Sequence, residues 1–120
     1  MYKRQIGGTF LRARDPVALL AWYAEHLGIE PTPWGGHVFE AGRGDATVWS
    51  LFPAGTEYFG RPEQQAMLNY RVRDLDAMLA QLRASGADVD ERVQEDGNGR
   101  FGWATDPEGN RFELWEPPSA

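Results

Sequence analysis

The chain has 120 residues, of which 42% are hydrophobic and 25% charged, and its formal net charge is −6. This length and composition suit one folded domain with a modest core, and an acidic chain of this size is repelled by the phosphates of nucleic acid. The absence of cysteine excludes disulfides, thiolate metal sites and thiol nucleophiles. No apolar run is long enough to cross a bilayer, and the N-terminal residues lack the apolar stretch of a signal peptide, so we expect a cytoplasmic protein without membrane contact.

The first half of the sequence predicts a strand, a helix and two further strands. Asp15-Pro16 supplies a helix cap followed by a proline suited to the first helical position, and Gly28 is typical of the residue at which a helix ends. The predicted order is a strand at 5–13, a helix at 17–26, strands at 37–40 and 46–52 joined by a turn at 42–45, and a connecting loop at 53–65.

The second half repeats this pattern. Asp74 is placed to cap a second helix, whose apolar residues line one face, and Gly86 closes it. The predicted order is a strand at 67–72, this helix, a less distinct strand at 88–94, and strands at 100–104 and 110–115 joined by a turn at 106–109.

The two halves also match residue by residue. Arg12-Ala13-Arg14-Asp15 corresponds to Arg71-Val72-Arg73-Asp74 at a spacing of 59 residues, and Gly28 corresponds to Gly86. A unit of this size cannot bury its own sheet, so we expect the two to form one domain with the helices on the outside.

Several motifs carry a resemblance to a known family. They are Arg14-Asp15-Pro16, Trp22-Tyr23, His26-Leu27-Gly28-Ile29 and the long C-terminal run from Asp106 to Trp115. With these motifs the chain resembles the vicinal oxygen chelate superfamily, which includes glyoxalase I, extradiol dioxygenases and bleomycin-resistance proteins. The resemblance implies an α+β fold of two tandem βαβββ modules that form a cupped mixed sheet, usually completed by dimerisation. The modules would span about 5–53 and 66–117, with a linker at about 54–65.

The resemblance also implies where metal ligands would lie. In metal-using members the first and last strands of each module supply them, and these positions fall here on Gly8, Trp49, Met67 and Glu113. Glycine, tryptophan and methionine do not replace histidine or carboxylate ligands of a divalent ion. We therefore expect no metal and no other cofactor. The histidines are His26 and His37; the first suits a helix C-terminus and the second opens a strand.

Strand alternation in the register that the family implies predicts which side chains line the cup. These inward residues are Gly8, Phe10, Arg12, Thr47, Trp49, Leu51, Met67, Asn69, Arg71, Arg111, Glu113 and Trp115. Residues of the opposite parity, such as Leu114 and Val72, are more apolar and suit the side that packs on the helices. Among the inward residues we expect seven to contact a ligand: Phe10, Arg12, Trp49, Met67, Asn69, Arg71 and Trp115.

Several roles stay open at this stage. Arg12 and Arg71 either hold a ligand carboxylate or pair with Glu113 and neighbouring acids. Glu113 is either a general base in an apolar site or a structural partner of Arg71. Tyr58, in the loop between the modules, is a candidate proton donor if this loop covers the cup, whereas a flexible connector is the simpler interpretation.

Three functions follow. The first is a homodimeric, metal-free protein that binds a small organic molecule, either to sequester it or to convert it. The second is a metal-independent enzyme of lyase or isomerase type that uses Glu113 or Tyr58 for proton transfer. The third is a metal-dependent lyase, isomerase or dioxygenase whose site has shifted to His37 and Glu113.

Overall fold

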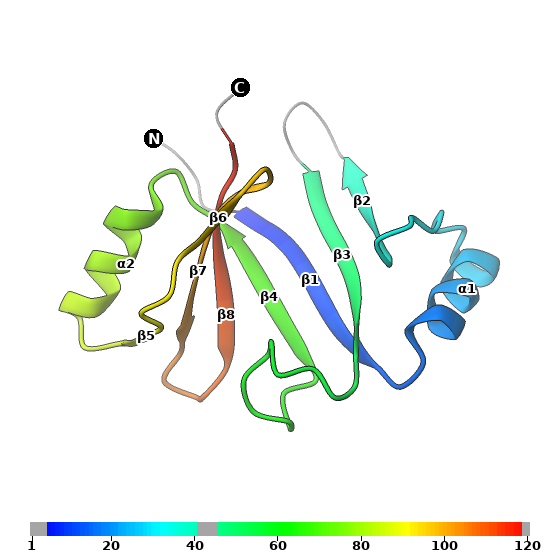
Figure 1. Ribbon diagram of the computed structural model, residues 1–120, viewed down its shortest axis with the longest axis horizontal. Helices are drawn as coiled ribbons and strands as arrows, with labels where there is room; N and C mark the ends of the chain where they lie inside the picture. Colours follow the sequence, from blue (N-terminus) through cyan, green and yellow to red (C-terminus); the bar gives the residue numbers. More distant parts are fainter. Residues whose placement is uncertain (1–4, 41–45, 119–120) are drawn as a thin grey trace. The chain divides into compact units, whose positions relative to one another are not determined.

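The computed structural model describes residues 5–40 and 46–118, and the predicted turn at 42–45 lies outside them. The chain divides into two compact units: the N-terminal unit is Gly8–Ala66, and the C-terminal unit contains the residues up to Gly7 together with those from Met67 on. The elements in chain order are β1 (Gln5–Ala13), α1 (Pro16–Leu27), β2 (Gly36–Glu40), β3 (Ala46–Pro53), β4 (Ala66–Arg71), α2 (Leu75–Ala84), β5 (Asp88–Val89), β6 (Gln94–Asp96), β7 (Gly99–Thr105) and β8 (Arg111–Glu116) (Figure 1). The predicted α+β class, with mixed strand pairing and two helices, is confirmed.

In the N-terminal unit, β3 lies between β1 and β2. It pairs in parallel with β1 and antiparallel with β2. Helix α1 connects β1 to this pair, and it begins as predicted: the Asp15 side chain accepts a hydrogen bond from the Ala18 N–H. It ends at Gly28, whose backbone is left-handed (φ 69°), a conformation that suits glycine because it has no Cβ.

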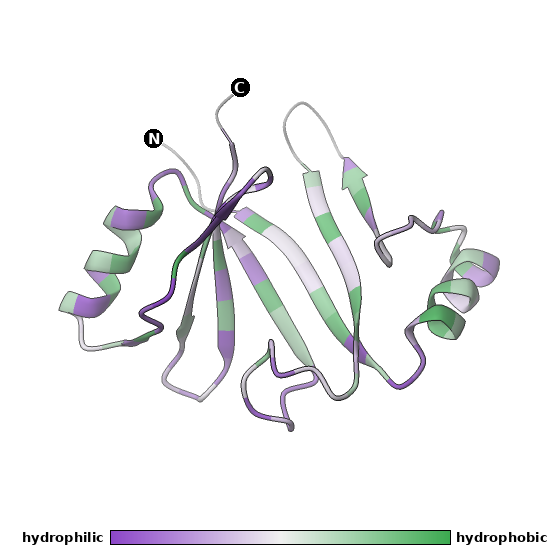
Figure 2. Ribbon diagram, viewed as in Figure 1, coloured by the Kyte–Doolittle hydropathy of each residue, from purple (hydrophilic) through white to green (hydrophobic). Residues whose placement is uncertain are grey.

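Helix α1 is apolar over much of its length (Figure 2), and yet none of its residues is buried. Its contact with the sheet includes an edge-on pairing of Tyr23 with Trp49 on β3, whose ring centroids are 4.9 Å apart. Val17 and Leu27 remain 79% and 63% exposed. A helix of this composition is usually buried, so α1 presents apolar surface that its own unit does not cover.

The C-terminal unit has the better-packed core. Strand β8 lies between β4, with which it is parallel, and β7, with which it is antiparallel; β5 and β6 both pair with β7. Leu75 and Leu79 of α2 pack against Val72 and Leu114, and all four are at most 4% exposed. Burial of these aliphatic side chains holds the helix on one face of β4 and β8.

Two details of this unit differ from the prediction. The single strand predicted at 88–94 is replaced by two very short strands, β5 and β6, because residues 90–93 leave the sheet between them and β6 continues to Asp96. Helix α2 ends at Ala84 with Ser85 as its capping residue, one position before the predicted Gly86, which adopts the positive φ. The N–H of Ala87 bonds back to the Leu82 carbonyl and completes the turn.

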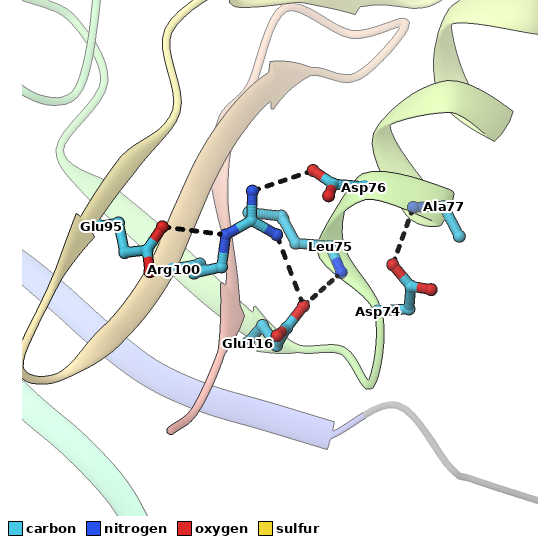
Figure 3. Close-up of polar contacts among 7 residues, drawn as sticks. All are labelled: Asp74, Leu75, Asp76, Ala77, Glu95, Arg100 and Glu116. Carbon is cyan, nitrogen blue, oxygen red and sulfur yellow. Dashed lines mark hydrogen bonds and ion pairs between the residues drawn. The ribbon is translucent and has the colours of Figure 1, made fainter. Parts of the chain in front are cut away.

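One arginine on the surface of the C-terminal unit forms ion pairs with acidic residues of three other elements (Figure 3). Arg100 on β7 lies 3.0 Å from Asp76, 3.6 Å from Glu95 and 3.8 Å from Glu116. Glu116 also accepts a hydrogen bond from the Leu75 N–H at the start of α2. The hydrogen bond to Asp76 raises the pKa of Arg100, which is in any case charged at neutral pH, so this cluster joins α2, β6, β7 and β8 without chemical reactivity.

Within the described residues no helix has the length and apolar character needed to cross a membrane.

Candidate functional site

The C-terminal unit presents a polar face on the side of β4 and β8 opposite α2. Asn69 pairs in register with Glu113, and Arg71 with Trp115. Paired residues share a face, and the alternate residues Tyr70, Phe112 and Leu114 pack toward α2. The structure therefore agrees with the prediction of which alternate residues in these two strands face the helix and which face the opposite side.

Glu113 is the centre of this face and is only 2% exposed. One of its carboxylate oxygens accepts a hydrogen bond of 2.5 Å from the Asn69 side-chain amide, and the other accepts one of 3.0 Å from the indole N–H of Trp103. Trp103 is fully buried on β7, directly opposite Glu113 in the antiparallel register. The carboxylate is thus held on both oxygens by N–H donors from its two neighbouring strands.

Asn69 has one polar atom left over. Its amide nitrogen donates to Glu113, and its Oδ1 is buried with no hydrogen-bond partner among the described residues. Gly7 lies against this atom, so closely that a Cβ there would overlap Oδ1 and approach Trp115 to 3.0 Å. The missing side chain at Gly7 therefore makes room for the Asn69 amide.

The other predicted residues of this face surround that pair. Met67 is fully buried, and Arg71 is 6% exposed. The Arg71 guanidinium donates to the side-chain oxygen of Gln5 at 2.8 and 3.2 Å. Trp115 donates its indole N–H to the Asn98 carbonyl and stacks on Phe101.

The N-terminal unit departs from the prediction at Trp49. The parallel register pairs Phe10 with Ser50 and Arg12 with Phe52, so these residues share one face of β1 and β3. Trp49 points to the other face, where Tyr23 of α1 packs against it. The expectation that Trp49 lines the same surface as Phe10 is wrong by one residue, and Ser50 is the true counterpart of Glu113 in the repeat.

Arg12 forms no ion pair with a carboxylate among the described residues. Its guanidinium donates to four backbone carbonyls of the loop after β3: Gln64 at 2.7 Å, Ala54 at 2.8 Å, Thr56 at 2.7 Å and Arg61 at 3.1 Å. It is 6% exposed and also lies over the Phe59 ring, 5.0 Å from its centroid. The ion pair weighed from the sequence is therefore wrong, because Arg12 fixes the loop instead, and ligand binding by Arg12 stays a prediction.

Tyr58 belongs to this fixed loop. Its ring stacks on Phe52 with centroids 5.3 Å apart, and its neighbour Phe59 is fully buried. The loop is therefore packed onto the β1–β3 face of the N-terminal unit rather than being a loose connector.

The two histidines both belong to the N-terminal unit. His37 pairs with Trp49 in the antiparallel register, which puts it on the α1 side of the strands, and its Nδ1 lies 3.0 Å from the Glu30 carbonyl oxygen. His26 stacks on Trp22 near the end of α1, with its Nδ1 2.9 Å from the Trp22 carbonyl. Among the described residues no group of three or more His, Cys, Asp or Glu side chains is placed to hold a metal ion.

The residues at the family's ligand positions do not fit a divalent ion. Gly8 and Met67 supply no nitrogen or oxygen ligand, and Ser50 supplies a neutral hydroxyl. Each oxygen of Glu113 accepts a hydrogen bond from an N–H group, which takes up one of its lone-pair directions and places a positive dipole end beside it.

Sequence reasoning missed Trp103 and Gln5. The signal for Trp103 was present, because the turn at 106–109 joins two antiparallel strands and so places Trp103 opposite Glu113. Gln5 has no comparable signal, since its contact with Arg71 spans 66 residues.

Comparison with known proteins identifies relatives of this architecture. The model of the glyoxalase-like domain family matches residues 8–115. Among solved structures, methylmalonyl-CoA epimerase from Mycobacterium tuberculosis is 23% identical with a TM-score of 0.69, covering 95% of this chain and 88% of its own. A Streptomyces coelicolor methylmalonyl-CoA epimerase variant in complex with 2-nitronate-propionyl-CoA is 17% identical with a TM-score of 0.71, covering 96% and 98%. A hypothetical protein from Bacillus halodurans is 11% identical with a TM-score of 0.70, covering 99% and 98%. No curated protein matches.

Proposed function

Because this chain belongs to the glyoxalase-like domain family of the vicinal oxygen chelate superfamily, we propose that it binds a small organic molecule without the help of a metal ion. The site is the polar face of the C-terminal unit, formed by Met67, Asn69, Arg71, Glu113 and Trp115. The observation that carries the proposal is that both oxygens of Glu113 accept hydrogen bonds from N–H groups.

This arrangement favours binding over metal-dependent chemistry. A metal bound to Glu113 would compete with the Asn69 amide and the Trp103 indole for the two carboxylate oxygens, and the positive ends of both N–H groups would repel it. The alternative of a shifted metal site at His37 is weaker, because among the described residues no group of three or more His, Cys, Asp or Glu side chains is placed to hold a metal ion.

The chemistry of the ligand follows from the hydrogen-bonding atom of this face that has no partner and from the apolar side chains beside it. Asn69 Oδ1 is an acceptor without a donor among the described residues, and it is buried against Gly7, so a ligand hydroxyl or amide N–H would have to displace that contact to bond with it. Met67 and Trp115 supply polarizable apolar surface beside it. We therefore propose a small, partly apolar ligand with at least one hydrogen-bond donor.

The test measures metal content first and then thermal melts. Elemental analysis of the purified protein is expected to give far less than one metal per chain, and melts with Zn²⁺, Mn²⁺, Ni²⁺, Mg²⁺ or EDTA are expected to coincide. Glu113→Gln should lower the melting temperature equally in all of these conditions, because its amide NH₂ must face one of the two donors. One tightly bound metal per chain, or a metal-dependent rise in melting temperature that Glu113→Gln removes, would refute the proposal.

Conversion of the ligand is the second candidate. Glu113, on the polar face of the C-terminal unit, or Tyr58, in the N-terminal unit, would then transfer a proton. The specific support is the burial of Glu113, which is only 2% exposed. Once a ligand is identified, product formation that Glu113→Gln or Tyr58→Phe abolishes without loss of affinity would establish an enzyme. If the ligand is recovered unchanged after long incubation, the protein sequesters it and does not convert it.

We also propose a homodimer. Strand β2 is the last strand of its unit, and its Val38 and Phe39 are 37% and 42% exposed, a surface that a second copy can cover. Sedimentation is expected to give a dimer at micromolar concentration, and Phe39→Lys is expected to weaken it. Val93→Lys, at a residue that is 38% exposed in the other unit, is the matched control. A wild-type protein that sediments as a stable monomer would contradict this proposal.

A further inference from the structure

A cavity lies within the N-terminal unit, which does not contain the polar face described above. It is open to solvent, has a volume of about 920 Å³, and is lined by the end of β1, the first two turns of α1 and the loop after β3. Arg14 and Trp22 line it together with Arg12, Asp15, Pro62 and Gln65; the remaining wall is alanine and leucine. Its size is in the range of cavities that hold small organic ligands.

Two parts of the cavity wall are held by hydrogen bonds before any ligand binds. On one side, Arg12 ties the loop by its four hydrogen bonds to carbonyls, and the Gln65 side chain donates to the Arg12 carbonyl at 3.0 Å. On the other side, Asp15 caps α1 through the Ala18 N–H. Preorganised walls lower the entropic cost of binding.

The charge of the cavity favours a monoanion. Arg12 brings a positive charge whose hydrogen-bond partners are neutral carbonyls, and it forms no ion pair among the described residues. Arg14 is exposed and makes neither an ion pair nor a hydrogen bond within the described part of the chain. Asp15 contributes one negative charge, so the lining carries a net charge of +1 in a protein whose overall charge is −6.

Trp22 provides a flat apolar surface. It is 49% exposed, and the His26 ring stacks on it with centroids 4.4 Å apart and an interplanar angle of 17°. Tyr23 meets the indole edge-on, at 5.2 Å between centroids. The part of the indole that these rings leave open lines the cavity and suits an aromatic ring.

We propose that this cavity is a second binding site, specific for a small aromatic carboxylate. The ring packs on Trp22, and the carboxylate accepts hydrogen bonds from the Arg14 guanidinium in the field of Arg12. Asp15 disfavours dianions such as phosphate esters, because a second negative charge would approach its carboxylate. This site is separate from the one proposed for the family's ligand and does not depend on it.

The experiment is a titration with benzoate, with benzamide as the uncharged analogue of similar shape. Nitrogen–proton NMR spectra follow the indole N–H signals of the five tryptophans, that of Trp22 being assigned with Trp22→Leu. For a ligand as small as benzoate we expect a Kd on the order of 1 mM. Arg14→Gln should weaken benzoate binding about 10-fold or more, and benzamide should bind wild type as weakly as benzoate binds that variant.

The internal repeat supplies a matched control, because Arg73 occupies the place before α2 that Arg14 occupies before α1. Arg73→Gln and Glu113→Gln should both leave benzoate affinity unchanged. Three results would overturn the proposal: no shift of the Trp22 signal with benzoate, equal affinity for benzamide, or equal weakening by Arg14→Gln and Arg73→Gln. Loss of binding in Glu113→Gln alone would assign benzoate to the polar face of the C-terminal unit instead.

Discussion

Removal of the Arg12 side chain is the sharpest test of how the N-terminal unit is held together. Arg12→Ala takes donors away from four carbonyl oxygens of the loop, of which the bond to Gln64 is buried and the other three are partly buried. A buried carbonyl left without a donor costs about 1–3 kcal/mol, and a partly buried one that water reaches costs about 0.5–1 kcal/mol. We therefore expect Arg12→Ala to lower the free energy of unfolding by about 3–5 kcal/mol, a large part of the stability of a small domain.

Urea denaturation measures this loss, and two further variants separate its causes. Arg12→Lys keeps the charge but not the planar set of donors, so it should recover about half of the lost stability. Arg14→Ala, two residues away and exposed, should change stability by less than about 0.5 kcal/mol. Chymotrypsin cleavage after Phe59, which is fully buried, reports opening of the loop and should be much faster in Arg12→Ala.

Two outcomes would refute this reasoning. A loss below about 1 kcal/mol in Arg12→Ala would mean that water or other donors satisfy the loop carbonyls equally well. Full recovery in Arg12→Lys would mean that charge alone, rather than the arrangement of donors, holds the loop.

Three further predictions concern the C-terminal unit. Gly7→Ala should destabilise by about 1–3 kcal/mol in urea, because its methyl group overlaps the Asn69 amide, whereas Gly55→Ala, with open space around it, should not. Leu79→Ala should cost about 2–5 kcal/mol because it empties the core beneath α2, and equal stability of the variant would contradict that packing. The hydrogen bond from the Arg92 N–H, and then the contact with Arg111, hold the pKa of Asp90 below its usual 3.8, so its contribution to stability is complete above about pH 4 and is lost as the pH falls through the lower folded value. The gap in unfolding free energy between wild type and Asp90→Asn should therefore narrow as the pH falls below about 4, and a gap that stays constant in acid would exclude this origin.

The C-terminal unit was predictable because its signals agree with one another. Asp74 caps α2 as its sequence position indicates, and the residues of one parity in β4 and β8 are apolar while those of the other are polar. That alternation fixes which face packs on the helix, and with it the position of Glu113.

The N-terminal unit was less predictable for physical reasons. Strand β3 is apolar on both faces, so alternation gave no information on its register, and Trp49 was assigned to the wrong side. The role of Arg12 had no sequence signal either, because its partners are backbone carbonyls, which every residue of a loop possesses.

Strand β1 has a consequence for the order in which the chain is made. Its first residues, up to Gly7, group with the C-terminal unit, and Gln5 accepts two hydrogen bonds from Arg71. On a ribosome, Gln5 therefore emerges more than sixty residues before the partner that satisfies it. The N-terminal end of β1 cannot form its contacts with β4 until β4 has been synthesised, so the native strand is completed only late in translation.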